Sequence, residues 1–489
     1  MAFLTLADTT RLALGGIGDY AHDLVAPTIR LGVTGLSRSG KTVFTTALVH
    51  NLLHGGRLPM FDVMAEGRFI RAYLQPQPDF DLPRFDYEGH LATMLGTDRH
   101  WPDSTKRISQ LRVSLEYQPT GFFARRFGSG TINIDIVDYP GEWLLDLPLL
   151  DQSFEQWSAA MIDTARGAAR APLSEDWLES LQTIDPEAPE DEHQARLTAQ
   201  LFTAYLQRCR DEDRAFSTVP PGRFLMPGEF EGSPLLTFSP LITDADGSAP
   251  KGSQWAMMAA RFEAYKRHVV KPFFHNHFCR LDRQIVLVDA LSALNAGPAA
   301  VADLSSALTD ILRAFRPGRN SWLSSILMKR IDRVVFAATK ADHLHQTSHD
   351  RLEAITARLV DQAKNRAEFA GARVDVVALA AVRATREAMA KQRGGDLPCI
   401  MGVPEKGQKL GKQTFSGEEE VAVFPGDLPD DPDEAMAGDS KAGTMADGPY
   451  RFLRFRPPKA MQSPHGSAPL LPHIRLDAAL NFLLGDRLA

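Results

Sequence analysis

The sequence has 489 residues, of which 44% are hydrophobic and 24% are charged, a composition typical of a globular protein with more than one domain-sized unit. Its formal net charge of -7 argues against nucleic acid or an anionic membrane as the partner, because such surfaces bind basic faces. We expect a cytoplasmic protein, because its three cysteines fit no disulfide framework and its N-terminus lacks a signal-peptide pattern.

The predicted elements begin with a helix within residues 1–28 that packs on the next part of the chain. The apolar run Ile29 to Gly35 predicts a strand, and Thr42 to Leu53 predicts the helix after it. Further strands are predicted at Leu111 to Tyr117, Thr131 to Asp138, Gln284 to Asp289, Arg333 to Thr339 and Val374 to Ala380. Because helical patterns follow several strands, we expect a three-layer α/β domain with a mainly parallel sheet.

A helical insertion is predicted within this domain. Between residues 144 and 280 the strand pattern stops, and amphipathic stretches such as Glu192 to Arg210 and Ser253 to Phe278 have helical spacing. The α/β domain is therefore expected in two parts, residues 29–143 and 281–395. No stretch of the sequence reaches the about 18 apolar residues of a membrane-spanning helix.

The C-terminal part of the chain is predicted to leave the main sheet and return to it. Residues 396–448 are rich in Gly, Pro and Asp, and indicate a loop-rich acidic excursion on the surface. In residues 449–489 we expect a short strand at Tyr450 to Arg456 and a helix at Leu476 to Leu484, both packing on the core.

The segment Gly35 to Thr42 matches the Walker A pattern and lies between the first strand and its helix, where a phosphate-binding loop belongs. We therefore expect the α/β domain to be a three-layer P-loop NTPase domain of the Ras-like kind. Backbone amides and the helix N-terminus would hold the phosphates, Lys41 would bridge the β and γ oxygens, and the Thr42 hydroxyl would ligate Mg²⁺. The residues expected to contact the nucleotide here are Gly35, Ser37, Arg38, Ser39, Gly40, Lys41, Thr42 and Val43.

A second motif follows the strand that ends at Asp138. Asp138 would hold Mg²⁺ through water, and the amide of Gly141 would bond the γ-phosphate and sense its presence. Glu142 stands where many P-loop GTPases have a glutamine that orients the attacking water. Its carboxylate could accept a proton from that water or could repel the phosphate, and Arg38 or Arg107 could act as an arginine finger.

A third candidate magnesium ligand lies between these two motifs. The stretch Trp101 to Arg107 precedes a predicted strand, where a mobile loop would bring a hydroxyl to the ion. Thr105 is the first candidate and Ser104 the second. A solvated turn of polar residues would have a similar composition.

A base-reading motif, Thr339, Lys340 and Asp342, directly follows a predicted strand. The Asp342 carboxylate would accept hydrogen bonds from N1 and the exocyclic amine of guanine, whereas N1 of adenine carries no proton. The motif therefore favours GTP over ATP. After the next strand, the backbone of Ala381 and Val382 is expected beside the base, although an ordinary strand-to-helix loop would look the same.

Taken together, Thr34 to Thr42, Trp101 to Thr105, Asp138 to Glu142 and Thr339 to Asp342 resemble the YcjX-like family of P-loop proteins. The resemblance spans nearly the whole chain. It implies a Ras-like nucleotide-binding core with helical insertions, in a cytoplasmic bacterial protein linked to stress responses. ATPase and GTPase labels are both used in the family, and the resemblance implies no defined protein partner.

We therefore expect an Mg²⁺-dependent GTPase that hydrolyses GTP to GDP and phosphate as a stress-related molecular switch. Lys41, Thr105 and Glu142 are the candidate catalytic residues. Movement at Gly141 would pass into the helical insertion, where an unidentified protein partner would bind. Three alternatives stay open: an ATPase, a P-loop kinase with a small acceptor, and a binding module with negligible turnover.

Overall fold

The computed structural model describes residues 26–36, 38–120, 129–210, 216–242, 250–313, 331–369, 371–392, 395–437, 452–459 and 469–489. A helix was predicted within residues 1–28, and residues 1–25 of that range lie outside the described part of the chain. Ser37 of the Walker A segment also lies outside it.

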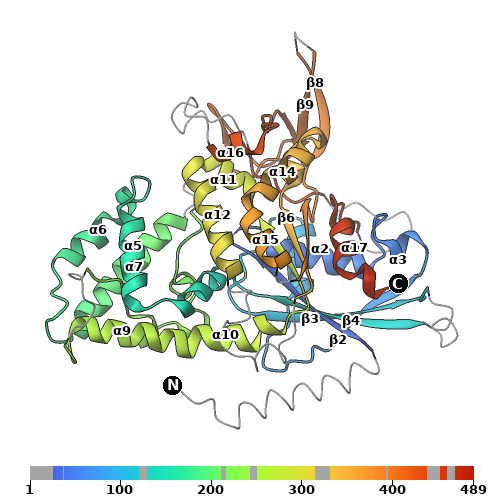
Figure 1. The fold of residues 1–489 in the computed structure, drawn as a ribbon. Helices are drawn as coiled ribbons and strands as arrows, with labels where there is room; N and C mark the ends of the chain where they lie inside the picture. Colours follow the sequence, from blue (N-terminus) through green and yellow to red (C-terminus); the bar gives the residue numbers. More distant parts are fainter. Residues whose placement is uncertain are drawn as a thin grey trace.

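A sheet forms the centre of the described chain (Figure 1). It has seven strands in the order β2-β3-β4-β1-β5-β6-β7. The strands are β1 (Thr28–Gly35), β2 (Phe69–Gln75), β3 (Ser109–Tyr117), β4 (Gly130–Asp138), β5 (Arg283–Val288), β6 (Arg333–Ala338) and β7 (Arg373–Ala378). Neighbouring strands from β4 to β7 are parallel, whereas β2 and β3 join antiparallel. The predicted α/β fold with a mainly parallel sheet is confirmed.

Helices cover both faces of this sheet because alternate strand residues point to opposite sides. In β6, Val334, Phe336 and Ala338 belong to one core, and Val335 and Ala337 to the other. The helices on the two faces and at the sheet edge are α2 (Lys41–Leu53), α3 (Asp62–Ala65), α4 (Tyr87–Leu95), α11 (Ala290–Ala296), α12 (Pro298–Arg313), α14 (His349–Leu359), α15 (Asp361–Phe369) and α17 (Leu476–Leu484). Short 3-10 turns lie at η7 (Ala341–His343), η8 (Gln346–Ser348) and η9 (Gly485–Arg487).

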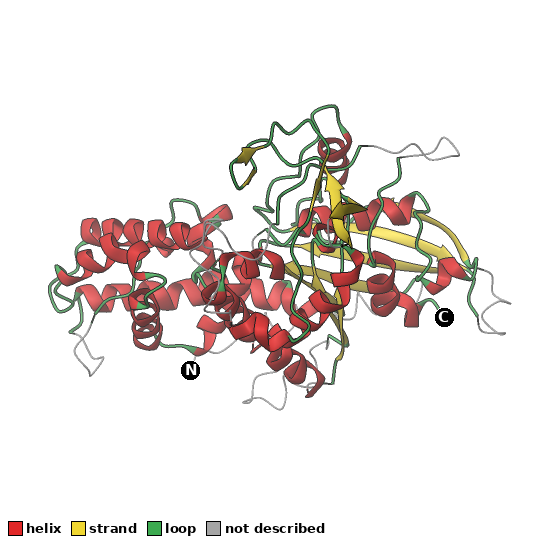
Figure 2. Ribbon diagram, turned by 90° about the horizontal axis from the view of Figure 1, so that it is seen from above, coloured by secondary structure: helices red, strands yellow, loops and turns green. Residues whose placement is uncertain are grey.

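Between β4 and β5 the described residues form helices, which lie to one side of the sheet (Figures 1 and 2). The longer ones are η2 (Gly141–Asp151), α5 (Phe154–Arg166), α6 (Ala171–Gln182), α7 (Glu192–Arg210), α9 (Gln254–Tyr265), a π-helical turn (Lys266–Val270) and α10 (Lys271–Asn276). The shorter ones are α8 (Gly222–Leu225), η3 (Gly228–Phe230), η4 (Pro234–Leu236) and η6 (Phe278–Arg280). We call residues 152–280 the helical segment.

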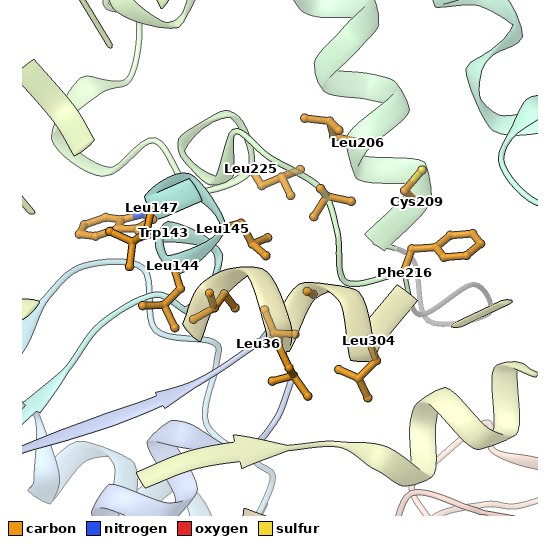
Figure 3. Packing of buried hydrophobic residues seen from close by; sticks show 14 of the residues in the cluster. Leu36, Trp143, Leu144, Leu145, Leu147, Leu206, Cys209, Phe216, Leu225 and Leu304 are labelled. Atoms are coloured by element: carbon orange, nitrogen blue, oxygen red, sulfur yellow. The ribbon is translucent and has the colours of Figure 1, made fainter. Parts of the chain in front are cut away.

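Stacked aromatic side chains fill the interior of the helical segment. Trp157 stacks on Phe262 with 5.0 Å between ring centroids, and Trp177 stacks on Tyr205 at 5.2 Å. These residues belong to the same continuous core as one face of the main sheet. Figure 3 shows the junction, where Leu144 and Leu145 of η2 lie between the helical segment and Leu36 of the P-loop. The helical segment therefore shares its core with the sheet domain.

The region after β7 contains a second, smaller sheet, which the sequence did not predict. Its strands are β8 (Arg386–Gln392), β9 (Gly395–Gly402) and β12 (Val421–Val423), with the separate pair β10 (Lys409–Leu410) and β11 (Gln413–Thr414), and helix α16 (Pro432–Ala437) follows. Residues 396–448 were predicted as a loop-rich excursion, but their described part contains most of β9 and all of β10, β11 and β12. Strand β8 lies just before them, in the range predicted as the second part of the P-loop domain. The small sheet has its own core, made of residues that are distant in the sequence: Ile400, Phe415, Val423, Leu453 and Phe455. No local sequence pattern indicates this small core.

The strand predicted at Tyr450 to Arg456 is wrong for the residues described there. Residues 452–456 contain no strand, and a single bridge joins Phe455 to Pro404 of the small-sheet region, away from the main sheet. Phe455 is buried in the small core, which explains its apolar character. The helix predicted at Leu476 to Leu484 is α17, which packs on β6 of the main sheet.

Two further features of the fold bear on function. The parallel strands β1, β4, β5, β6 and β7 end at the same edge of the sheet, so the loops that follow them meet there. Within the described ranges, no helix is both long enough and apolar enough to cross a membrane.

Candidate nucleotide-binding site

The Walker A segment forms a tight loop between β1 and α2. β1 ends at Gly35, the backbone takes left-handed conformations at Arg38 (φ 62°) and Gly40 (φ 87°), and α2 begins at Lys41. The loop thus delivers the N-terminus of a thirteen-residue helix to the sheet edge. Free backbone amides and the positive end of the helix dipole make such a terminus suitable for anions.

The side chain of Lys41 is buried inside this loop. Its Nζ donates to the carbonyl oxygens of Gly35 at 2.8 Å and Leu36 at 3.2 Å. Burial lowers the pKa of Lys41 from its ordinary value, while the nearby carboxylates of Glu142 and Asp138 act in the opposite direction. A buried ammonium that bonds to neutral carbonyls of its own loop can bind an anion without giving up an ion pair.

Two hydroxyls and a carboxylate gather beside the start of α2. The hydroxyls of Thr42 and Thr105 lie 3.1 Å apart, and the Thr105 hydroxyl donates to Oδ2 of Asp138 at 2.8 Å. The other oxygen, Oδ1 of Asp138, is buried and has no hydrogen-bond partner among the described residues. Burial raises the pKa of Asp138 to about 6, although Lys41 and the Thr105 hydroxyl lower it.

This donor set fits a magnesium ion. Hydroxyl and carboxylate oxygens are the ligands that Mg²⁺ takes in nucleotide sites, and the unpaired Oδ1 of Asp138 marks where a cation would satisfy the site. Of the two hydroxyls considered on the Trp101 to Arg107 stretch, the structure brings Thr105 to Asp138 and leaves the Ser104 side chain exposed.

Gly141 lies directly against the P-loop. A Cβ atom at this position would be 1.8 Å from the carbonyl oxygen of Gly35 and 2.9 Å from Nζ of Lys41, so only glycine permits the contact. The next side chain, Glu142, is buried, and its Oε1 accepts from Nη1 of Arg210 at 3.4 Å. Arg210 is the last residue of α7, 68 positions further along the chain, and no motif in the sequence pointed to it.

The loop from Tyr139 to Asp151, which we call the β4 loop, is fixed to the helical segment. Oδ1 of Asp146 accepts from the amide of Gly222 at 2.7 Å, and Oδ2 accepts from the Tyr265 hydroxyl at 2.6 Å. Burial raises the pKa of Asp146 to about 7. Gly222 also lies very close to the β4 loop. A Cβ atom on Gly222 would be 1.8 Å from the carbonyl oxygen of Glu142.

The base-reading motif lies after β6 at the same sheet edge. Asp342 is buried, and its Oδ2 accepts from the amide of Ala384 at 2.8 Å. Lys340 has a left-handed backbone (φ 63°) and pairs with the partly buried carboxylate of Asp289 after β5. The amide of Thr339 donates to the carbonyl oxygen of Val288 at 2.9 Å. These bonds hold the Asp342 carboxylate in a fixed position beside the loop that follows β7.

One cavity of about 840 Å³ joins the phosphate side to the base side. Such a volume lies in the range of small-molecule sites. The predicted residues that line it are Arg38, Ser39, Gly40, Lys41, Thr42, Val43, Thr105, Glu142, Thr339, Lys340, Asp342, Ala381 and Val382. Asp138 lines a smaller adjoining cavity with Thr42, Thr105 and Arg107. The structure therefore brings the three separate motifs to one place.

Two walls of the cavity come from regions that no motif indicated. Arg210, Phe216 and Ser217 of the helical segment line one part, and Gln408 and Phe455 of the small-sheet region line another. The predicted helical insertion and acidic excursion thus both reach the site, which residue spacing alone could not reveal.

Comparison with known proteins gives a consistent picture. Residues 29–488 match the family described as "YcjX-like family, DUF463". A relative named "Ras-like GTPase YcjX" from Escherichia coli (strain K12) is 38% identical over 471 residues, covering 94% of this chain and 96% of the relative. A second protein of that name, from Shewanella oneidensis, is 34% identical over 483 residues and covers 94% of both chains.

The match extends from β1 to the C-terminal 3-10 turn, so it includes the helical segment and the small sheet as well as the P-loop. The resemblance noted in the sequence is confirmed: this chain belongs to the YcjX-like family.

Proposed function

We propose that this protein binds GTP with Mg²⁺ in the cavity and hydrolyses it to GDP and phosphate. The observation that carries the proposal is that one cavity joins Lys41 and Thr42 to the buried carboxylate of Asp342. The names of the two relatives, both Ras-like GTPases, support it.

On the phosphate side, the loop amides, Lys41 and the start of α2 would hold the β- and γ-phosphates. Thr42, Thr105 and Asp138 would hold Mg²⁺, which neutralises charge on the phosphate oxygens when it is bound. Their hydroxyls and the unpaired Oδ1 of Asp138 support these roles. Gly141 would report the γ-phosphate, because its backbone lies against Gly35 and Lys41.

On the base side, Asp342 would select guanine. The Ala384 amide restrains one carboxylate oxygen, and the carboxylate would accept from N1 and the amine of guanine. Adenine would leave this buried carboxylate without those donors, a loss that typically costs about 1–3 kcal/mol. Lys340, Thr339, Ala381 and Val382 would complete the base pocket.

In hydrolysis a water oxygen bonds to the γ-phosphorus, the bond from that phosphorus to the β,γ-bridging oxygen breaks, and GDP and phosphate leave. Glu142 would orient the water and take up its proton, which then passes to solvent. The cavity wall formed by Glu142 supports this role, since the residue follows the glycine that lies against the P-loop.

At the level of the whole molecule, we propose a cytoplasmic, stress-related switch. The helical segment would act as a subdomain that receives the nucleotide state through the β4 loop and binds a protein partner. The hydrogen bonds of Asp146 and the close contact of Gly222 support this route.

Steady-state phosphate release from GTP and from ATP tests the activity. We expect turnover of GTP by the wild-type protein, loss of turnover in Lys41→Ala, and a rise in the KM for GTP of about 10- to 100-fold in Asp342→Asn. Asp375→Asn, an exposed carboxylate on the neighbouring strand β7, serves as the matched control and should behave as wild type. Equal or faster turnover of ATP, unchanged in Asp342→Asn, would make the protein an ATPase, and absent turnover despite tight GDP binding would make it a binding module.

A further inference from the structure

We propose that Arg210, which the helical segment supplies, stabilises the negative charge on the γ-phosphate during hydrolysis. Before GTP binds, Arg210 forms an ion pair with Glu142. The inference rests on the proposed function, because it concerns the γ-phosphate of a bound triphosphate.

The location of Arg210 is the first argument. Its guanidinium pairs with Glu142 at 3.4 Å, and both side chains line the cavity that contains Lys41 and Thr42. The Glu142 side chain is 4% exposed and that of Arg210 is 27% exposed, so the carboxylate lies deeper than the guanidinium that pairs with it. Glu142 directly follows Gly141, which contacts the P-loop at Lys41. Arg210 is thus one side chain away from where the γ-phosphate would be sensed.

Two other arginines suggested by the sequence lie less favourably. Arg107 is exposed and lines the smaller adjoining cavity beside Asp138, on the side of the magnesium ligands. Arg38 lines the main cavity but has an exposed side chain on the P-loop itself. Arg454, a further arginine of the cavity wall, pairs with Glu405 beside the small sheet. Among these, Arg210 is the one whose ion pair includes the candidate water-orienting residue.

Electrostatics explains why the pair would open on GTP binding. A buried carboxylate such as Glu142 requires a partner, and in this structure it has Arg210. A γ-phosphate beside Gly141 would add negative charge within reach of the same guanidinium. A guanidinium has five donors in a planar fork, so Arg210 could donate hydrogen bonds to the phosphate oxygens. It would thereby offset the repulsion between those oxygens and the Glu142 carboxylate. Its transfer toward the phosphate would free the Glu142 carboxylate to accept a hydrogen bond from water.

The last two turns of α7, which end at Arg210, are packed into the core. Leu206 and Cys209, in these two turns, are fully buried, and Figure 3 shows them near Leu225 and Phe216. The chain returns along the cavity wall at Ser217, whose amide donates to the Asp303 carboxylate of α12. The same carboxylate pairs with Arg170 of the helical segment. These contacts join the helical segment to α12 of the sheet domain at Ser217 and Arg170.

The test compares Arg210→Ala, Arg210→Lys and a control, Arg208→Ala. Arg208 lies two positions earlier on α7 and pairs at the surface with Asp176, with a side chain that is 39% exposed. For each folded variant we would measure single-turnover GTP hydrolysis, affinity for a non-hydrolysable GTP analogue, and binding of aluminium fluoride with GDP, a mimic of the transition state.

We expect hydrolysis by Arg210→Ala to fall by on the order of 10³-fold, with analogue affinity changed by less than about threefold and no aluminium fluoride complex. Arg210→Lys should be intermediate because it keeps the charge but not the fork. Arg208→Ala should stay within about twofold of wild type. Wild-type hydrolysis in Arg210→Ala would overturn the proposal, as would losses of hydrolysis and analogue affinity in equal measure. A wild-type protein that neither binds nor hydrolyses GTP would instead overturn the proposed function itself.

Discussion

The β4 loop and the stretch from Gly96 to Arg107 both bring side chains to the nucleotide cavity, but they are anchored in different ways. The β4 loop, which carries Glu142, is almost entirely buried and bonded to the helical segment. The Gly96 to Arg107 stretch, which carries Thr105, is largely exposed. Trp101 Nε1 donates to the carbonyl oxygen of Phe455 at 2.7 Å, linking this stretch to the small-sheet region.

The difference indicates two separate routes out of one site. A change at Gly141 or Glu142 meets a close backbone contact at Gly222 and buried hydrogen bonds at Asp146, so it would move α8 and α9 with it. A change at Thr105 meets hydrogen bonds such as that of Trp101, which are only partly buried and are therefore more easily exchanged for bonds to water. Substitutions on the first route should therefore have larger effects than substitutions on the second.

The largest effect is expected for Asp146→Asn, measured as pH-dependent stability. Asp146 faces Tyr265 and Arg223, and burial raises its pKa from 3.8 to about 7. Between these values the folded protein binds the proton more tightly than the unfolded chain, so wild-type stability falls as pH rises from about 4 to about 7, by on the order of 1 kcal/mol per pH unit. Asparagine can still accept from Gly222 and can donate to Tyr265.

Urea unfolding of wild type and Asp146→Asn at several pH values checks this. The stability difference should shift in favour of the variant as pH rises to about 7 and then stay level. Asp151→Asn, an exposed carboxylate at the end of the same 3-10 helix, should follow the wild-type curve. If the free energy of unfolding depended on pH in the same way for wild type and Asp146→Asn, burial would not raise the pKa of Asp146.

The next effect is expected for Gly222→Ala. The added methyl would overlap the Glu142 carbonyl oxygen, so the β4 loop and α8 must separate, at a cost of about 1–3 kcal/mol. We expect GTP hydrolysis to fall about 10-fold through displacement of Glu142. Chemical denaturation and phosphate release measure the two effects.

Gly167→Ala is the matched control, since Gly167 has a negative φ of -58° and its nearest neighbour to an added Cβ is 3.2 Å away. If Gly222→Ala were as stable and as active as this control, the close contact between the β4 loop and the helical segment would not matter for activity.

The smallest effect is expected for Trp101→Phe, on the second route. The change removes the hydrogen bond to the Phe455 carbonyl, worth about 0.5–1.5 kcal/mol, and keeps an aromatic ring. We expect nearly unchanged hydrolysis but GDP release faster by about two- to fivefold, measured with a fluorescent GDP. An effect on hydrolysis larger than that of Gly222→Ala would reverse the ranking of the two routes.

The two routes also differ in how far they could be predicted. The Walker A segment, Asp138 to Gly141 and Thr339 to Asp342 are local motifs at strand ends, and the parallel sheet brings strand ends together, so their meeting could be expected. Arg210 could not be expected, because its role depends on how α7 packs against the β4 loop. Chain folding, not local sequence, also decides that Asp146 is buried against Gly222.

The same distinction holds for the fold. Strands with strong apolar patterns, such as β1 and β6, were predicted, whereas β2 lies at the sheet edge with side chains that are mostly partly exposed, so its pattern is weak. The small core around Ile400 and Phe455 joins residues from distant segments, and the sequence therefore indicated only loops and a misplaced strand there.

The central claim is that one nucleotide site is connected both to the helical segment and to the small-sheet region. Hydrogen–deuterium exchange tests it in the wild-type protein with Mg²⁺, loaded either with GDP or with a non-hydrolysable GTP analogue. We predict that amide protection differs between the two states in residues 216–226 of the helical segment, and less strongly in residues 452–457. Identical exchange in both segments, with the P-loop protected by nucleotide in both states, would contradict it.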